Sequence, residues 1–236
     1  MSSLIDEKSG SISHSMPQLY LLRHGETDWN VQKRLQGRTD TSLNDAGRAQ
    51  ALRHGAQLEL ELARFFQSSS LKNIHLQNEL KAWSFVSSPL KRCRETMEIV
   101  LSALELPSYS YDIDDRLLEI SFGEWEGKSW VELRDETPKL VEARFKNPWD
   151  VSGPQGETYT ELRSRVLSWY EDLSVNTIAV THSGPSRIVR SAVSNLPEDQ
   201  VLSLESPQNR FIKVYTNGFE WICTWLTNGF KLLNEN

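Results

Sequence analysis

Short apolar runs rich in β-branched and aromatic residues alternate along this chain with longer segments of helical spacing. The runs occupy residues 18–23, 82–88, 176–182, 210–216 and 220–225. Such runs are typical of buried strands, whereas the intervening segments place apolar residues three and four positions apart, as amphipathic helices do. Strands that alternate with helices predict an α/β domain of three layers, in which helices cover both faces of a sheet.

Three of the predicted helices have start signals at their first residues. Asn44 is a favourable N-cap, and the helix that it begins is expected to run through ALRHGAQLELELARFF. Ser88 as N-cap with Pro89 at the first helical position predicts a second helix through LKRCRETMEIVLSALEL. Gly184 and Pro185 follow a predicted strand and precede SRIVRSAV, which indicates a third strand-to-helix junction.

Length and composition allow one large globular domain or two small ones, and they argue against a nucleic-acid surface. The chain has 236 residues and a net charge of -6, whereas a nucleic-acid-binding protein is expected to carry a basic stripe. Residues 1–16 are serine-rich and are expected to form a flexible leader, and no interdomain linker divides residues 17–236. The polar stretch 67–81 is expected to be a surface connection.

The same composition bears on where the protein is expected to reside. No stretch approaches the roughly 20 apolar residues that a membrane helix needs, so we expect a soluble protein with no membrane partner. The chain has two cysteines, Cys93 and Cys223, which are far apart and outside any metal-ligand spacing. Such cysteines fit a reduced, cytoplasmic setting.

Chemically unusual residues stand where three of the predicted strands end. Arg23 and His24 follow YLL, two serines lead from a second strand to Arg92, and His182 follows IAVT. If these strands are parallel neighbours, the groups converge in the crevice beyond the carboxyl ends of the sheet. Two arginines, two histidines and the donors of a helix start would suit an anion, and phosphate is the obvious one.

The same residues predict chemistry that rests on histidine. A neutral imidazole between cationic groups can attack phosphorus, because nearby cations disfavour its protonation. Glu119 is the candidate proton donor for the leaving oxygen, with Glu124 and Glu126 as alternatives. The absence of a GxxxxGK[ST] loop and of a compact carboxylate cluster argues against a P-loop enzyme or a magnesium phosphatase. Cys93 lacks the CxxxxxR loop of a cysteine phosphatase and is expected to be a small packed residue.

Five motifs in this order resemble the histidine phosphatase superfamily, which includes cofactor-dependent phosphoglycerate mutases and many broad phosphatases. They are RHGETDWN at 23–30, LQGRTDTSLNDAGRAQA at 35–51, SSPLKRCRET at 87–96, LLEISFGEWEG at 117–127 and VTHSGP at 180–185. The resemblance covers almost all of the chain after the leader. It implies a three-layer sandwich with a mostly parallel central sheet flanked by helices, forming a single domain over 17–236 with a small cap insertion at about 123–157.

The resemblance also implies a role for each site residue. His24 would become a transient phosphohistidine and Glu119 would serve as acid and base. The groups that would hold the transferred phosphoryl are Arg23, Arg92 and His182. Further contacts with the substrate would come from Asn30, Gln36, Gly37 and Ser183. Members of the family need no metal and, for hydrolysis, no cofactor.

Within the family, the cap favours hydrolysis over mutase activity. It resembles the shorter cap of the phosphatase branch, whereas true mutases have a longer insertion with a pair of adjacent arginines, which this stretch lacks. The expected activity is therefore a phosphatase acting on a small phosphorylated metabolite. A phosphoglycerate mutase and a catalytically silent phospholigand-binding protein are the alternatives.

The sequence predicts less about the cap and about the remaining histidines. The tryptophans of this region could either form an apolar wall over the substrate or pack the cap, and these are Trp125, Trp130 and Trp149. Basic residues of the cap hint at an acidic partner, and these are Lys128, Arg134, Lys139, Arg144 and Lys146. Three histidines are expected to be structural or solvated in leader, helix-surface and loop contexts, and these are His14, His54 and His75.

Overall fold

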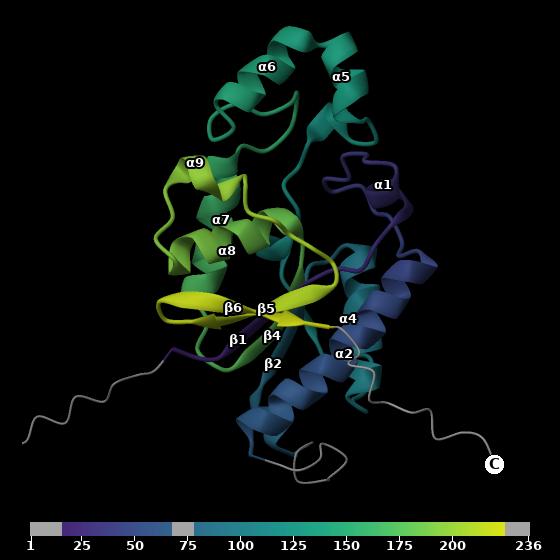
Figure 1. Cartoon of the computed structure of the whole chain (residues 1–236), viewed down its shortest axis with the longest axis vertical. Coiled ribbons are helices and arrows are strands. Elements are labelled where there is room, and N and C mark those ends of the chain that lie inside the picture. Colours follow the sequence, from purple (N-terminus) through teal and green to yellow (C-terminus); the bar gives the residue numbers. More distant parts are fainter. Residues whose placement is uncertain (1–15, 68–77, 225–236) are drawn as a thin grey trace, which may run out of the picture.

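The computed structural model describes residues 16–67 and 78–224, which form a six-stranded sheet between layers of helices (Figure 1). The strand order is β3-β2-β4-β1-β5-β6. The strands are β1 (Leu19–Arg23), β2 (Ser84–Ser87), β3 (Asp112–Ile113), β4 (Thr177–Thr181), β5 (Arg210–Tyr215) and β6 (Gly218–Cys223). The first four in spatial order are parallel to one another, β5 pairs antiparallel with β1, and β6 pairs antiparallel with β5. The predicted three-layer sandwich with a mostly parallel sheet is confirmed.

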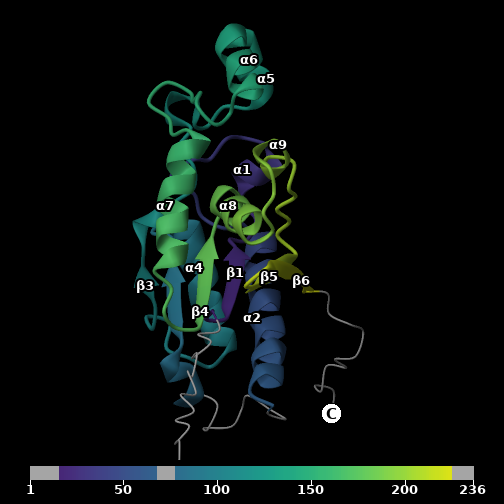
Figure 2. The same cartoon turned by 90° about the vertical axis from the view of Figure 1, so that its left-hand side faces the viewer.

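Two pairs of helices cover the two faces of the sheet (Figure 2). One core contains Tyr20 and Leu22 of β1 together with side chains of α2 (Asp45–Phe65) and α4 (Lys91–Ala103). The other contains Leu19 and Leu21 with side chains of α7 (Tyr159–Glu171) and α8 (Ser183–Val193). Successive residues of β1 thus serve opposite cores, as the period of two in a strand requires.

While η1 (Leu80–Ala82) precedes β2 at one end of the sheet, most of the remaining helices lie at the other end, where the parallel strands finish. There α5 (Trp130–Glu136) and α6 (Pro138–Lys146) stand farthest from the sheet (Figure 1). A small core of Leu35, Trp125, Leu133 and Val141 lies beneath them. The short helices are α1 (Asp28–Val31), α9 (Glu198–Val201), η1 (Leu80–Ala82), η2 (Asp115–Leu117) and η3 (Gly123–Trp125). No helix in the described ranges is long and apolar enough to cross a membrane.

The first predicted helix start is confirmed and the second is wrong. Asn44 caps α2 by accepting a hydrogen bond from the Gly47 amide. Helix α4 begins at Lys91, not at Pro89, because the Ser88 hydroxyl is hydrogen-bonded to His182 at 2.8 Å. The cap comes instead from Asp40, whose carboxylate accepts from the Lys91 amide at 2.6 Å.

The predicted strands are also one or two residues too long at some ends, and the two-residue strand β3 was missed because a run this short has no readable period. The predicted leader lies outside the described residues except at its last position, residue 16, and the surface connection 67–81 is described only at its ends.

His54 is buried, so its predicted placement on a helix surface is wrong. It lies on the stripe of α2 that also buries Ala51 and Leu58, and its ring packs edge-on against Phe211 with centroids 5.8 Å apart. Burial, together with the neighbouring charge of Arg53, lowers the pKa of His54 to about 4, partly offset by the backbone of Gln208. His14 and His75 lie outside the described residues.

The buried His54 predicts a fold that loses stability in acid. The unfolded chain protonates this histidine near pH 6.5, whereas the folded protein does so only near pH 4. The unfolded state therefore binds more protons between these values, and stability falls as the pH is lowered through that window. Relative to His54→Leu, the wild type should lose about 1.4 kcal/mol of unfolding free energy for each pH unit. Urea unfolding of both proteins at about pH 7.5 and about pH 5 measures this difference, and a difference independent of pH would contradict it.

Candidate active site

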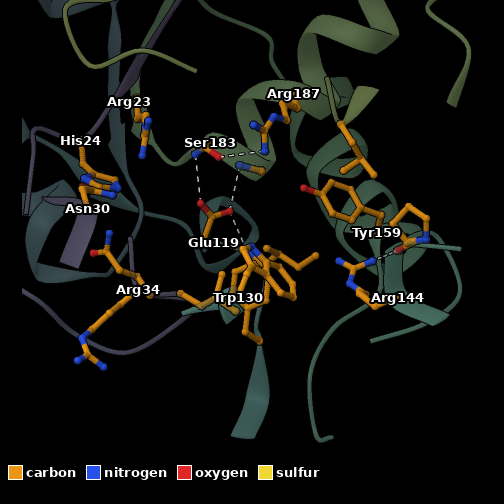
Figure 3. Close-up of a pocket in the computed structure, with 18 of the residues that line it drawn as sticks. Arg23, His24, Asn30, Arg34, Glu119, Trp130, Arg144, Tyr159, Ser183 and Arg187 are labelled. Atoms are coloured by element: carbon orange, nitrogen blue, oxygen red, sulfur yellow. Dashed lines mark hydrogen bonds between the residues drawn. The ribbon is translucent and has the colours of Figure 1, made fainter. Parts of the chain in front are cut away.

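A cavity of about 410 Å³ opens beyond the carboxyl ends of β1, β2 and β4. Strand β4 lies between the other two, so the residues that follow all three strands are neighbours. The backbone pairing continues past the strands, since the His24 amide donates to the Thr181 carbonyl and the Ser88 amide donates to Val180. Figure 3 shows the labelled lining side chains Arg23, His24, Asn30, Arg34, Glu119, Trp130, Arg144, Tyr159, Ser183 and Arg187.

His24 presents one nitrogen to the cavity and anchors the other. Its Nδ1 lies 2.7 Å from the Gly25 carbonyl oxygen. A carbonyl only accepts, so Nδ1 carries the proton and the Nε2 lone pair is free. Burial first, then the charges of Arg92 and Arg23, hold the pKa of His24 well below its usual range. The ring is therefore neutral and available as a nucleophile at neutral pH.

His182 lies directly behind His24 and does not itself line the cavity. The two rings meet edge to face with centroids 5.2 Å apart. His182 Nε2 is 2.8 Å from the Ser88 hydroxyl and 3.3 Å from the Cys93 thiol, and all three residues are buried. Burial and the charge of Arg92 hold the pKa of His182 well below its usual range as well. Cys93 is a packed residue, as predicted, and burial raises the pKa of its thiol to about 12.

Arg23 and Arg92 line the same cavity as His24, and each is held by backbone carbonyls. Arg92 donates to the carbonyls of Gly37 and Thr39, both at 2.8 Å, and Arg23 donates to Ser206. Burial lowers the pKa of Arg23 to about 10, so it stays cationic at neutral pH. The Nε atoms of both side chains are buried without a hydrogen-bond partner among the described residues. Because their hydrogen-bond partners are neutral carbonyls, both guanidinium groups keep a full charge for a ligand.

The loop between β1 and α2 supplies amide groups. Asn30 uses its carbonyl oxygen to accept from the Thr27 amide and from Gln208. Gln36 likewise uses its oxygen to accept from the hydroxyls of Thr27 and Thr41. Because each side chain commits its oxygen to the protein, its NH₂ group is the end left to donate to a ligand.

The Glu119 carboxylate sits over the first turn of α8, at the edge of the cavity. It accepts from the amides of Gly184 at 3.0 Å, Ser183 at 3.2 Å and Ile120 at 3.0 Å. Residue 184 must be glycine for this contact, since an added Cβ would lie 2.4 Å from a Glu119 oxygen.

The two alternative glutamates are used elsewhere. Glu124 accepts from the Gln155 side chain. Glu126 accepts from the amides of Arg38 and Thr39 and so fixes the loop that carries Gly37. Neither glutamate lines the cavity, whereas Glu119 does.

The structure thus brings all but one of the predicted site residues to the cavity wall, with His182 as the exception. Sequence reasoning missed the lining residues Arg34, Tyr159 and Arg187. Of the five basic cap residues, only Arg144 reaches the cavity. The cap tryptophans divide: Trp130 lines the cavity, while Trp125 packs beneath the cap.

Chemically, this arrangement is an anion site built around a neutral imidazole. Five arginines and one carboxylate line the cavity, and this cationic excess suits a phosphoryl group. Within the described residues, no group of three histidines, cysteines or carboxylates could hold a metal ion.

The comparisons with known proteins fit this geometry. A profile of the Histidine phosphatase superfamily (branch 1) matches residues 19–228. A relative from Escherichia fergusonii named "Probable phosphoglycerate mutase GpmB" is 31% identical over 153 residues, which cover 65% of this chain and 61% of the relative. The chain therefore spans about three fifths of the length of this relative.

Two solved structures share the fold. Bacillus stearothermophilus YhfR is 28% identical with a TM-score of 0.66, covering 88% of this chain and 96% of its own. The α-ribazole phosphatase from Shigella flexneri also has a TM-score of 0.66 over 88% of this chain and 96% of its own, at 22% identity. At that identity, the second match shows the fold alone.

The charges of Arg23 and Arg92, which form no salt bridge among the described residues, predict that inorganic phosphate binds beside His24. Arg23→Gln should weaken phosphate binding by about 10-fold or more, since a hydrogen bond to a charged group is worth about 1.5–3 kcal/mol. Arg94→Gln, on the exposed side of α4, is the matched control and should bind like the wild type. Isothermal titration at low salt measures both, and equal affinities for the two variants would exclude this placement of the anion.

Proposed function

The chain belongs to branch 1 of the histidine phosphatase superfamily, and we propose that it is a phosphatase that hydrolyses small phosphomonoesters through a phosphohistidine on His24. The observation that carries the proposal is the state of His24. Its Nδ1 proton is fixed on Gly25, its pKa is held low, and its free Nε2 faces a cavity with two uncompensated arginines. These are the properties of a nucleophile for phosphorus.

In the first half of the proposed reaction, the phosphoryl group moves to His24. Nε2 forms a bond to phosphorus while the bond from phosphorus to the ester oxygen breaks. Arg23 and Arg92 balance the charge of the phosphoryl oxygens, and the proton of Glu119 goes to the leaving oxygen. His182, packed against the His24 ring, holds that ring in place.

In the second half, water replaces the alcohol. Glu119, now ionised, is stabilised by the three amides that it accepts from and takes a proton from the attacking water. The N–P bond breaks, inorganic phosphate leaves, and His24 returns to the neutral state. Every cationic group in this scheme is a side chain of the protein, so we propose that no metal takes part.

Hydrolysis and mutase activity differ in the acceptor of the second step. A mutase returns the phosphoryl group to a sugar acid, and the relative from Escherichia fergusonii bears a mutase name. The absence of adjacent arginines in the sequence of the cap supports water as the acceptor here. Conversion of 3- to 2-phosphoglycerate after priming with 2,3-bisphosphoglycerate would instead assign the mutase reaction.

Replacing the proposed nucleophile should abolish turnover. His24→Ala is expected to lower kcat on p-nitrophenyl phosphate at least about 1,000-fold, because the covalent route is lost. The wild type, quenched during turnover of a ³²P-labelled ester, should carry an acid-labile and alkali-stable label that His24→Ala lacks. His54→Leu, which removes a buried histidine outside the cavity, is the control and should retain the label. Phosphate binding with no turnover in the wild type would indicate a silent binding protein.

Replacing the proposed acid should have an effect that depends on the leaving group. Glu119→Gln cannot donate a proton, so an alkyl phosphate, whose alkoxide leaves poorly, should lose about 100-fold or more in kcat. p-Nitrophenyl phosphate, whose phenolate leaves without a proton, should lose much less. Glu124→Gln is the matched control because its carboxylate lies outside the cavity. Equal losses on both esters would assign Glu119 a role other than proton transfer.

A further inference from the structure

The cavity contains more positive charge than one phosphoryl group requires. Two of its five arginines, Arg23 and Arg92, act on His24 through their charge. Arg144 lies across the view from His24, with Glu119 between them (Figure 3). Arg187 lies between Arg23 and Arg144 in the same view, and its charge also helps to lower the pKa of Arg23. None of these four forms a salt bridge with a carboxylate in the part of the chain that the structure describes. Buried charge without a counter-ion is costly, and such charge commonly awaits a ligand.

Arg187 is oriented by neutral groups. Its Nε donates to the Leu204 carbonyl at 2.8 Å and its Nη1 donates to the Ser183 hydroxyl at 3.4 Å. These contacts fix the guanidinium at the cavity wall without cancelling its charge. Arg187 lies on α8, the same helix whose first amides hold Glu119.

Arg144 reaches the same region from the cap. Its side chain is buried, at 5% exposure, and donates to the Pro148 carbonyl. Its guanidinium lies over the Tyr159 ring, 5.2 Å from the centroid. Tyr159 is itself buried and directs its hydroxyl toward the middle of the cavity (Figure 3). Two cations and one hydroxyl donor therefore converge from α6, α7 and α8.

Two rings of the cap, together with Phe122, form an apolar wall of the cavity. Trp130 packs edge to face on Phe122, with ring centroids 6.0 Å apart. The ring centroids of Trp130 and Phe145 are 4.9 Å apart. All three rings line the cavity. A cavity of about 410 Å³ is of the size that accommodates a small metabolite, so a ligand can reach both ends.

We propose that the substrate carries a second anionic group, a carboxylate or a second phosphoryl, which Arg187 and Arg144 bind while the ester phosphate lies against His24. The inference rests on the proposed phosphatase function and narrows its substrate to a phosphomonoester with two separated acidic groups. Tyr159 donates a hydrogen bond to the same second group. The apolar wall covers the carbon body between the two ends.

The test compares matched pairs of esters that differ in the second group. 3-Phosphoglycerate against glycerol 3-phosphate tests a carboxylate, and fructose 1,6-bisphosphate against fructose 6-phosphate tests a second phosphoryl. In at least one pair, the wild type should favour the acidic member by about 10-fold or more in kcat/KM, as a charge-assisted bidentate contact would give. Arg187→Gln and Arg144→Gln should each reduce that preference by about 10-fold, and Arg187→Lys should retain most of it.

Arg134→Gln is the matched control, since Arg134 lies on the cap over Phe145 but outside the cavity, and it should keep the wild-type preference. The same pairs are titrated calorimetrically against His24→Ala, so that binding is measured whether or not turnover occurs. Absence of turnover with a preserved binding preference would overturn the phosphatase function and keep the second anion site. Equal kcat/KM and equal affinity within both pairs, or a preference unaffected by both glutamine variants, would overturn the site.

Discussion

Positive charge that no carboxylate cancels, gathered beyond the carboxyl ends of β1, β2 and β4, is the constraint around which this structure is organised. The arginines of the cavity are held mainly by backbone carbonyls: Arg92 by Gly37 and Thr39, and Arg187 by Leu204. A carbonyl orients a guanidinium as well as a carboxylate would, but leaves its charge intact. Burial first, and then the same charge, hold the pKa of His24 low, so the proposed binding of the anion and the proposed reactivity of His24 depend on the same buried arginines.

Holding that charge requires rigid surroundings. The loop after β1 is tied to the sheet by the bond from the His24 amide to Thr181, and it lies directly on α2. That contact is so close that a Cβ on Gly47 would lie 2.1 Å from the Glu26 carbonyl oxygen. A buried, preorganised site stabilises a transferring phosphoryl group without reorganising during the reaction. The cost is that a buried neutral histidine such as His54 is expected to make the fold sensitive to acid.

The end of the cavity around His24, which we propose is catalytic, was predictable from sequence because each strand delivers its residues directly. Arg23 is the last residue of β1 and His24 follows it, and both line the cavity. The short apolar run before them is enough to identify that strand. Arg187 and Arg144 were not predictable in this way, because an arginine inside a helix faces the site only if the helix packs at one particular rotation. The burial of His54 was missed for a related reason: a polar residue can occupy the apolar stripe of a helix when a ring such as Phe211 lies opposite.

The predicted start of α4 was wrong for a third reason, and this reason also shows how the site is built. Ser88 resembles a helix cap in the local sequence, but its hydroxyl is hydrogen-bonded to His182, 94 residues later in the chain. Asp40 caps the helix in its place. The capping propensity of Ser88 is therefore overridden by its tertiary contact with His182, which packs against His24. The two ends of the cavity therefore have separate structural sources: strand ends and their loops build the reactive end, while α6, α7 and α8 build the end that would select the substrate. Changes in the cap can then alter which ester enters without disturbing the groups around His24.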